Sequence, residues 1–271
     1  MPELPEVETI KRDLEKELTG AILKGVFIHN ENFLKRHHLT KEDFKAIEEK
    51  AVEALERKGK FLSLLFEEKA LIFHLGLTGT LIFNPVRKSS INLSHAVLSL
   101  YFDKGELLFR DMRKFGKVFL LSRKKLPEFF AKIGLDALEI SYEDFKRSIV
   151  NHRGNIKAFF LSQKYISGLG NIYTDELLFR ARISPFRRGL DLSEEEILRL
   201  YQEMKTLLNE AIALRGSSIR DYVDGEGKRG HFQERHLVYG KAESPCPICQ
   251  TPLKRTLIAQ RGTTYCPNCQ K

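Results

Sequence analysis

All four cysteines of this 271-residue chain lie in the segment Cys246-Pro-Ile-Cys249-Gln-Thr-Pro-Leu-Lys-Arg-Thr-Leu-Ile-Ala-Gln-Arg261-Gly-Thr-Thr-Tyr-Cys266-Pro-Asn-Cys269. In each Cys-x-x-Cys pair, two thiolates of one turn can face the same tetrahedral ion, and the second pair completes the site. The residues between the pairs read as a hairpin with strands at 253–259 and 263–265. The segment therefore predicts one structural Zn²⁺ held by Cys246, Cys249, Cys266 and Cys269, with no coordination position open for chemistry.

The chain is basic, with a net charge of +9 and a pI of about 9.3. From Glu226 to Lys271 there are eight Lys or Arg residues and three Glu residues, so this sixth of the chain carries +5. Excess positive charge favours nucleic acid or an anionic surface as the partner. A solvated basic surface without a ligand is the alternative, and the uneven distribution favours a localised binding surface.

Length and patterning favour two or more domains, each long enough to bury its own core. No apolar run approaches membrane-spanning length. The acidic N-terminus does not look like a signal peptide, which would be basic and then apolar. We therefore expect no membrane partner and a soluble, cytoplasmic protein, in which disulfide bonds are a poor alternative to metal binding.

The N-terminal sequence is Met1-Pro2-Glu3-Leu4-Pro5-Glu6. Removal of Met1 would make Pro2 a secondary amine, part of which is unprotonated and nucleophilic at neutral pH. Amines attack carbonyl carbons and sugar C1′ centres to form imines, and Glu3 and Glu6 would supply an acid/base pair nearby. The alternative is an ordinary acidic helix start, which by itself explains these six residues better.

The first half of the chain predicts an antiparallel β-sandwich. A helix follows from the apolar spacing at 7–18, with Gly20 after its end. We expect an extended segment at 21–33 and a short helix at 41–50. Short strands separated by Gly, Asp, Asn or Lys turns are expected at 61–66, 70–75, 80–83, 96–102, 106–110 and 117–121.

Helical periodicity replaces the strand pattern after residues 124–138. Short helices are expected at 155–162 and 172–182, joined by Gly168-Leu-Gly170. The capping box formed by Ser193 and Glu196 opens a long amphipathic helix. A Gly-containing segment of mixed charge follows at 216–230, and it reads as a mobile loop.

Several residues are candidates for nucleic-acid contact. Asn171 follows a Gly turn at a helix start, where backbone N–H groups attract phosphate, although a plain inter-helix turn is equally compatible. Arg113 and Phe115 could enter a duplex, although a β-turn with a core Phe is the commoner explanation. Lys60 could contact phosphate or be solvated, and His74 could be a core residue. His95 and Arg153 are uninformative alone.

In their order along the chain, these motifs closely resemble the formamidopyrimidine-DNA glycosylase family. The resemblance runs from residue 2 to the last residue. Its motifs are Pro2-Glu-Leu-Pro-Glu-Val-Glu-Thr9, Lys60, His74-Leu-Gly-Leu-Thr-Gly79, Asp111-Met-Arg-Lys-Phe-Gly116, Gly168-Leu-Gly-Asn-Ile-Tyr-Thr-Asp-Glu176 and the four-cysteine finger.

This resemblance implies an α+β multidomain fold. A β-sandwich domain with flanking helices would span residues 1–132. A helix-two-turn-helix domain would span 133–230, with 216–230 as the loop that covers the flipped base. A zinc-finger β-hairpin would span 231–271. DNA would lie in a basic cleft between the domains.

The resemblance also implies a bifunctional enzyme of bacterial base excision repair. It would excise oxidised purines (8-oxoguanine and formamidopyrimidines) from double-stranded DNA, act on abasic sites, and cut the strand by β,δ-elimination. We expect a monomer that associates with the nucleoid through DNA. The alternative is a non-catalytic zinc-ribbon DNA-binding protein, which has no reason to keep Pro2, Glu3, Glu6 and Lys60 together.

Family roles fall on particular residues of this chain. Pro2 would attack C1′, Glu3 would donate a proton for sugar-ring opening, and Glu6 would support the site. Lys60 would serve phosphate binding and β-elimination, and Arg261 would grip the phosphate and assist δ-elimination. DNA contacts would come from His74, Leu77, His95, Arg113, Phe115, Arg153 and Asn171. Leu77 departs from the family's usual Met, and its similar volume predicts little functional loss.

Overall fold

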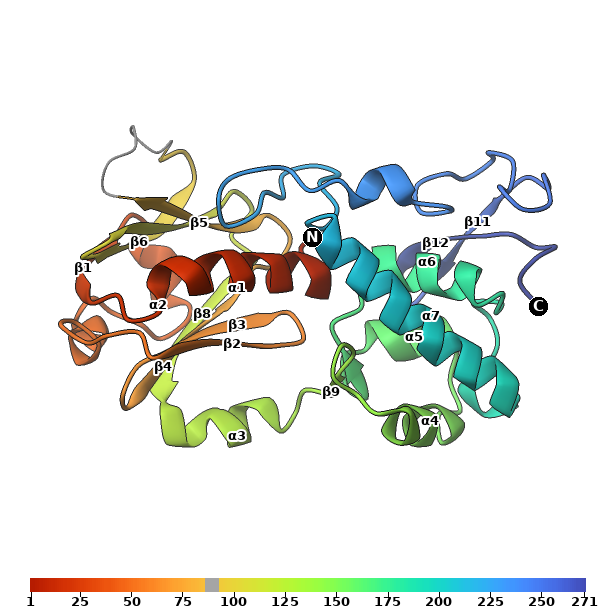
Figure 1. Cartoon of the computed structure of the whole chain (residues 1–271), viewed down its shortest axis with the longest axis horizontal. Coiled ribbons are helices and arrows are strands. Elements are labelled where there is room, and N and C mark those ends of the chain that lie inside the picture. Colours follow the sequence, from red (N-terminus) through yellow and green to blue (C-terminus); the bar gives the residue numbers. More distant parts are fainter. Residues whose placement is uncertain (86–92) are drawn as a thin grey trace. The chain divides into compact units, whose positions relative to one another are not determined.

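The computed structural model of the chain describes residues 1–85 and 93–271 (Figure 1). The chain divides into two compact units. The N-terminal unit comprises residues 1–131 and 214–231, and the C-terminal unit comprises residues 132–213 and 232–271. The segment 214–231 therefore groups with the N-terminal unit, whereas the finer division into three domains stays a prediction. Within the described residues, no helix combines the length and apolar character needed to cross a membrane.

The described part of the N-terminal unit contains two four-stranded antiparallel sheets (Figure 1). One sheet has the order β1-β6-β7-β5, and the other has the order β2-β3-β4-β8. The strands are β1 (Leu23–Ile28), β2 (Ala54–Lys58), β3 (Phe61–Leu65), β4 (Lys69–His74), β5 (Gly79–Pro85), β6 (Ala96–Phe102), β7 (Gly105–Asp111) and β8 (Lys117–Ser122). The predicted sandwich and its main strands are confirmed.

Alternating side chains of the strands divide between two apolar cores. Leu71 and Phe73 of β4 point into the main core together with residues of the other sheet, whereas Ile72 points to the opposite face. That face is covered by Leu126 and Phe130 of the short helix α3 (Leu126–Phe130). The period of two therefore buries both faces of this sheet.

Helix α1 (Leu4–Leu18) packs its apolar side against the main core and lies along the sheets in Figure 1. Val7, Ile10, Leu14 and Leu18 are completely buried, as their helical spacing predicts. Gly20 follows at a φ of 75°, in the left-handed region that favours glycine. The first long helix is thereby fixed at its apolar face and its C-terminal end.

Some elements of the N-terminal unit differ from the sequence-based expectation. The segment 21–33 was predicted to be extended, but α2 (Glu31–Lys35) begins within it because the Asn30 side chain accepts a hydrogen bond from Phe33 N. The helix expected at 41–50 is only a 3₁₀ helix, η1 (Glu42–Ala46). Strand β2 was not predicted, since it is a charged edge strand.

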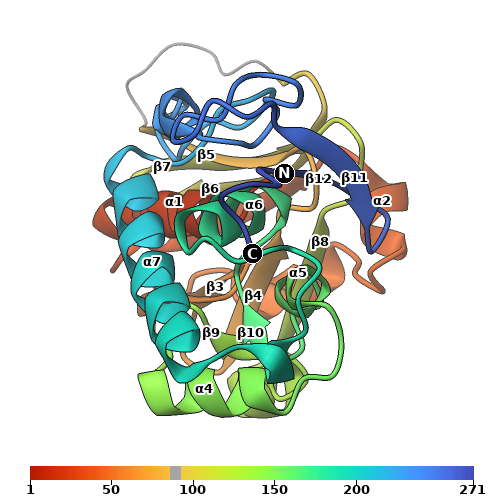
Figure 2. The ribbon, with the colours of Figure 1, turned by 90° about the vertical axis from the view of Figure 1, so that its right-hand side faces the viewer.

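The C-terminal unit is mainly helical (Figure 2). Its longest helix, α7 (Glu194–Ala213), packs against α4 (Tyr142–Val150) and α6 (Asn171–Arg180). The predicted capping box is present, because Glu196 N donates to Ser193 Oγ and Ser193 N donates to Glu196 Oε2. Its helices also include α5 (Ile156–Leu161), and β9 (Leu135–Asp136) pairs with β10 (Ile166–Ser167). Helix α4 was not predicted.

The four-cysteine segment forms the expected hairpin. Strands β11 (Lys254–Ile258) and β12 (Arg261–Tyr265) pair antiparallel, with Ile258 opposite Arg261. The two turn residues, Ala259 and Gln260, have φ values of 49° and 59°. Two consecutive positive φ angles match the twist of a tight hairpin, so Arg261 lies directly after its turn.

Candidate active site and zinc centre

The N-terminal residues form a buried start to helix α1. Pro2 is buried, and Glu3 is the N-cap residue. The Glu3 carboxylate accepts from the backbone N–H of Glu6, and Glu3 N donates to Glu6 Oε2 at 2.7 Å. Both carboxylates are 1% exposed. The helix-start reading of this sequence is therefore correct, and the same capping box also fixes two carboxylates beside Pro2.

Glu6 links this helix start to a remote segment of the same unit. Its Oε1 accepts from Ser217 N at 2.7 Å, so its two oxygens serve two different backbone N–H groups. Gly216 precedes Ser217 at a φ of 79°, and a Cβ there would lie 2.7 Å from Glu6 Oε1. Only glycine combines this backbone conformation with so close an approach.

Lys60 lies in the β2–β3 turn and is 8% exposed. Its neighbour Gly59 adopts a φ of 56° and accepts a hydrogen bond from Arg57 Nη1 at 3.1 Å. Arg57 Nε also donates to Glu8 Oε2 of α1 at 2.7 Å. The turn that carries Lys60 is thus fixed to the same helix that carries Pro2.

His74 ends β4 with its ring 4.7 Å from that of Phe61. Burial, followed by the positive charges of Lys60 and Lys117, lowers the pKa of His74 to about 4. Its Nδ1 accepts from Gly76 N at 3.3 Å, so the neutral ring carries its proton on Nε2. His74 is therefore a neutral donor at physiological pH.

Asp111 joins the two loops that carry the proposed wedge residues. It is fully buried, and its carboxylate accepts from Thr78 Oγ1 at 2.6 Å and from Gly116 N at 2.7 Å. Arg113 N donates to the same carboxylate at 3.2 Å. Thr78 belongs to the turn of Leu77, which is partly buried. One buried carboxylate thus holds the Leu77 turn against the Arg113–Phe115 loop.

Arg113 and Phe115 are exposed next to each other. The Phe115 side chain is 53% exposed, and the Arg113 guanidinium lies 5.0 Å from its ring centroid. The alternative of a core Phe in this turn is therefore wrong. His95 is also exposed, and its carbonyl accepts from Asp111 N at 3.0 Å, which places it beside this loop.

In the C-terminal unit, Asn171 is near the β11–β12 turn. Asn171 is the first residue of α6, and Gly170 is the N-cap. Asn171 Nδ2 and Lys157 Nζ both donate to the carbonyl of Gly262, at 2.9 and 3.1 Å. Arg261, directly before Gly262, is exposed. Arg153 is exposed shortly before α5. Asn171 and the hairpin turn of Arg261 are therefore close together.

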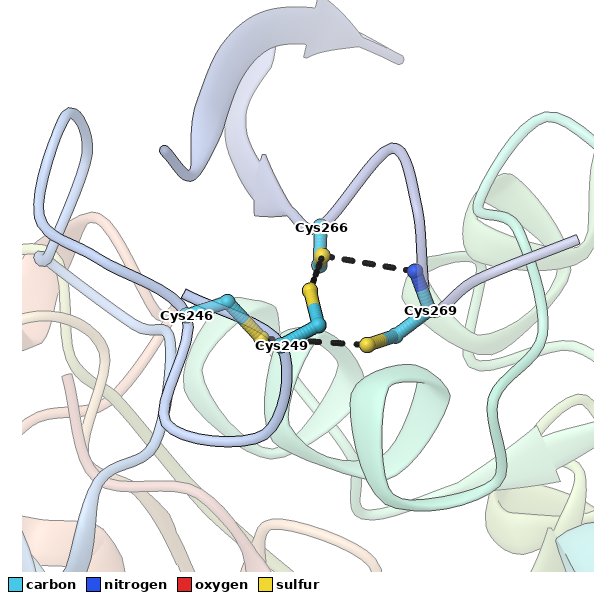
Figure 3. A group of neighbouring side chains, drawn as sticks. All are labelled: Cys246, Cys249, Cys266 and Cys269. Carbon is cyan, nitrogen blue, oxygen red and sulfur yellow. Dashed lines mark hydrogen bonds between the residues drawn. The ribbon is translucent and has the colours of Figure 1, made fainter. Parts of the chain in front are cut away.

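The four cysteines converge at one point (Figure 3). Their Sγ atoms all lie within 4.8 Å of one another, with Cys246–Cys269 at 3.8 Å and Cys249–Cys266 at 3.4 Å. A tetrahedron with Zn–S bonds of about 2.3 Å has edges of roughly 3.8 Å, so the arrangement fits Zn²⁺. These four thiolates hold one structural Zn²⁺, which ties both ends of the hairpin together.

Local sequence patterns predict most of these side chains but not the groups that hold them. Ser217 as the partner of Glu6, and Asp111 as the acceptor between two loops, are visible only in the structure. Such partners have no local signature, because Glu6 and Ser217 are 211 positions apart. Within each unit, the structure brings Pro2, Glu3 and Glu6 together, and separately Asn171 and the turn of Arg261.

Three family models match consecutive parts of the chain. They are the formamidopyrimidine-DNA glycosylase N-terminal domain over residues 1–118, the formamidopyrimidine-DNA glycosylase H2TH domain over 133–223, and the zinc finger found in FPG and IleRS over 243–271. Together they leave only residues 119–132 and 224–242 unmatched.

Full-length relatives point the same way. The chain is 38% identical over 276 residues to a formamidopyrimidine-DNA glycosylase of Geobacillus kaustophilus and 39% identical over 273 residues to that of Solibacter usitatus, with 100% of each chain covered. A crystal structure of a Lactococcus lactis FPG mutant with a Fapy-dG containing DNA matches at 32% identity with a TM-score of 0.90, again over 100% of both chains. MutM in complex with carbocyclic 8-oxo-G containing DNA matches at 32% identity with a TM-score of 0.89.

The fold and the site define a zinc-containing DNA glycosylase with lyase activity. The chain belongs to the formamidopyrimidine-DNA glycosylase family. The predicted fold class, zinc site and enzyme class are confirmed, and DNA is the partner. The roles of individual residues remain proposals.

Proposed function

We propose that this enzyme excises 8-oxoguanine and formamidopyrimidines from duplex DNA and cuts the strand at the resulting abasic site. The observation that carries this proposal is the buried start of α1, where Pro2 precedes two fixed carboxylates. Relatives bound to DNA with Fapy-dG, carbocyclic 8-oxo-G or an abasic site support the substrate class. We further propose that the enzyme acts as a monomer.

Base removal begins with the N-terminal amine. After loss of Met1, the lone pair of the Pro2 nitrogen forms a bond to C1′ and the glycosidic bond breaks. The base leaves with the proton that the Pro2 nitrogen gives up. The C1′–O4′ bond then opens as Glu3 donates a proton to O4′, which leaves an iminium between Pro2 and C1′. Glu6 holds the backbone of Glu3 in place during these steps.

Strand cutting follows from the same iminium, which acidifies the C2′ protons. Loss of one C2′ proton expels the phosphate from C3′, and loss of the C4′ proton from the resulting unsaturated iminium then expels the phosphate from C5′. Lys60 supports the first elimination and binds a phosphate, and its position in a turn fixed to α1 favours this role. Arg261, exposed after the hairpin turn, binds a phosphate and assists the second elimination.

The damaged base has to leave the duplex, because its C1′ is unreachable inside the stack. Exposed Phe115, with Arg113 beside it, fills the space left by the base, and Leu77 adds to this wedge. His74, His95, Arg153 and Asn171 contact the DNA backbone as donors. The segment 216–230 binds the extruded base, a role that its contact with Glu6 supports.

The test begins with an intact-mass measurement that establishes whether Met1 is removed. Protein with a free Pro2 is then incubated with duplex that contains 8-oxoguanine and with borohydride, which reduces an imine to a stable adduct. We expect a covalent protein–DNA species. A processed preparation that binds this DNA without forming an adduct or cutting the strand would contradict the proposal and favour a non-catalytic DNA-binding protein.

A further inference from the structure

The segment Leu214–His231, called here loop 214–231, closes on itself within the N-terminal unit. His231 N donates to the carbonyl of Leu214 at 2.8 Å, and Gly230 N donates to Ser218 Oγ at 2.8 Å. A Cβ on Gly230 would lie 2.3 Å from the carbonyl oxygen of Gly216. The loop is therefore a compact unit whose position depends on what its residues contact outside it.

Loop 214–231 contacts helix α1 at two places. The first is the hydrogen bond from Ser217 N to Glu6. The second lies two helical turns further along α1, where Arg215 Nη2 donates to Asp13 Oδ2 at 2.6 Å and Gly225 N donates to the same oxygen at 3.2 Å. A third contact joins the loop to β5, through Phe83 N and the carbonyl of Gly225 at 2.9 Å.

Arg215 joins two buried carboxylates. Besides Asp13, it contacts Asp224, since Arg215 Nε donates to Asp224 Oδ2 at 2.6 Å. Asp13 is 5% exposed and Asp224 is fully buried. The other oxygen of Asp224, Oδ1, accepts from the backbone N–H groups of Glu226 and Lys228. One guanidinium thus links α1 to the far side of the loop by pairing with a carboxylate on each.

The backbone of Arg215 also sets the direction of the residues that follow. Its φ is 61°, a strained value for a residue with a side chain. Tyr222 Oη donates to the carbonyl of Arg215 at 3.1 Å, and the next residues are Gly216 and Ser217. The ion pairs of Arg215 therefore lie two positions before the hydrogen bond from Ser217 N to Glu6.

We propose that Arg215 is a positioning residue. It holds loop 214–231 against α1, with Ser217 at Glu6 and Gly225 at Asp13, so that the loop can bind the extruded base beside Pro2. This inference rests on the proposed function. It assigns to Asp13 and Asp224 the role of the two carboxylate partners on the helix and in the loop. It predicts that weakening the ion pairs slows base release, whereas cutting at a pre-formed abasic site, which has no base to bind, continues.

The most selective variant is Asp224→Asn. Asparagine keeps Oδ1 as the acceptor for Glu226 N and Lys228 N, but it places an amide NH₂ where Oδ2 accepts from Arg215. The turn inside the loop is therefore preserved while the contact with Arg215 is lost. Arg215→Lys is the second variant, because one ammonium keeps the charge but cannot reproduce the fork of Nε and Nη2.

We expect Asp224→Asn to slow single-turnover release of 8-oxoguanine about tenfold. This factor corresponds to a loss of about 1.4 kcal/mol in the free energy that favours the loop position against α1 over other loop positions. Cutting of a pre-formed abasic site should change less than about twofold. Arg215→Lys should give an intermediate loss of base release. Hydrogen exchange at Ser217 N should accelerate in both variants, because its bond to Glu6 depends on the loop position.

The matched control is Arg123→Gln, which removes an arginine–carboxylate pair with Glu53 on the surface of the same unit. It should leave both reactions and the exchange of Ser217 N unchanged. Equal loss of base release and abasic cutting in Asp224→Asn, or an unchanged rate of base release, would overturn the role of Arg215. If the wild-type enzyme released no damaged base, the proposed function would fail instead, and the exchange of Ser217 N would still report whether Arg215 holds the loop.

Discussion

The backbone N–H of Ser217 donates to Glu6 Oε1 at 2.7 Å, across 211 positions of sequence. The other oxygen of the same carboxylate accepts from Glu3 N, directly after Pro2. Glu6 therefore connects the residues around the proposed nucleophile with loop 214–231. Because Glu6 is 1% exposed, loss of either bond removes a hydrogen bond from a buried part of the structure.

Replacement of Glu6 by Gln tests this connection. An amide offers only one acceptor oxygen, so we expect the free energy of unfolding to fall by about 1–3 kcal/mol and base release to slow. Urea unfolding measures the first effect. The matched control is Glu15→Gln on the same helix, where the carboxylate is 43% exposed and pairs with Lys11. Its effect should stay below about 1 kcal/mol, and equal effects of the two changes would contradict the role of Glu6.

Two glycines allow backbone strain to be separated from steric overlap. Gly216 and Gly20 have φ values of 79° and 75°, but a Cβ would meet Glu6 at 2.7 Å only at Gly216, and nothing lies within 4 Å at Gly20. Gly20→Ala should cost about 1–2 kcal/mol from its φ alone. Gly216→Ala should cost more and should also slow base release, since Glu6 has to move. Similar unfolding energies and activities for both variants would be inconsistent with a close contact at Gly216.

The pH dependence of stability should reflect the buried His74. The folded protein takes up this proton only near pH 4, whereas the unfolded chain takes it up near pH 6.5. The free energy of unfolding is therefore highest above pH 6.5 and falls as the pH falls toward 4, with a contribution from His74 of up to about 3 kcal/mol. His236, whose pKa burial lowers to about 4, acts in the same direction.

Chemical unfolding of wild type and His74→Gln at pH 7 and pH 5 measures this contribution. Glutamine has no proton to take up, so the variant should lose less stability between the two pH values than wild type does. His236→Gln provides the comparison in the other unit. This variant should also lose less free energy of unfolding between pH 7 and pH 5 than wild type does, whether or not His74 is replaced. Parallel curves for wild type and His74→Gln would show that His74 is protonated equally in both states.

Removal of zinc should melt the β11–β12 hairpin. The bound ion links the two Cys-x-x-Cys turns through four Sγ atoms, and its removal leaves the turns without these bonds. A chelator should therefore abolish DNA binding by the finger and disturb Arg261, while the N-terminal unit stays folded. Circular dichroism measures the loss of the hairpin, and a DNA titration measures the loss of binding. Added Zn²⁺ should restore the hairpin and the DNA affinity. Full DNA affinity in metal-free protein would rule out this dependence.

Much of the fold follows from local patterns in the sequence. The Cys-x-x-Cys spacing predicted the hairpin, and Ser193 with Glu196 predicted the start of α7, because each signal involves residues within one turn or one hairpin. The apolar spacing at Val7 and Ile10 likewise predicted α1. Strand β2 was not predicted because the charged run Glu56, Arg57 and Lys58 lacks the apolar alternation of a half-buried strand.

The candidate site was predictable only in part. Motifs identified Pro2 and Lys60, but the contacts that fix them come from Glu8, Arg57 and loop 214–231, which have no local pattern in common. No local pattern distinguishes Arg215 from the other basic residues of the chain. Its two carboxylate partners lie 202 positions before it and 9 positions after it. Such partners are determined by tertiary packing, so the structure was needed to find them.

The central claim is that the Pro2 nitrogen forms the covalent bond to C1′. Borohydride trapping on 8-oxoguanine duplex, followed by proteolysis and mass spectrometry of the adduct, tests it most directly. The account predicts a reduced sugar adduct on the N-terminal peptide, at Pro2, in protein that has lost Met1. An adduct on Lys60 or another lysine of Met1-processed protein, with Pro2 unmodified, would contradict it.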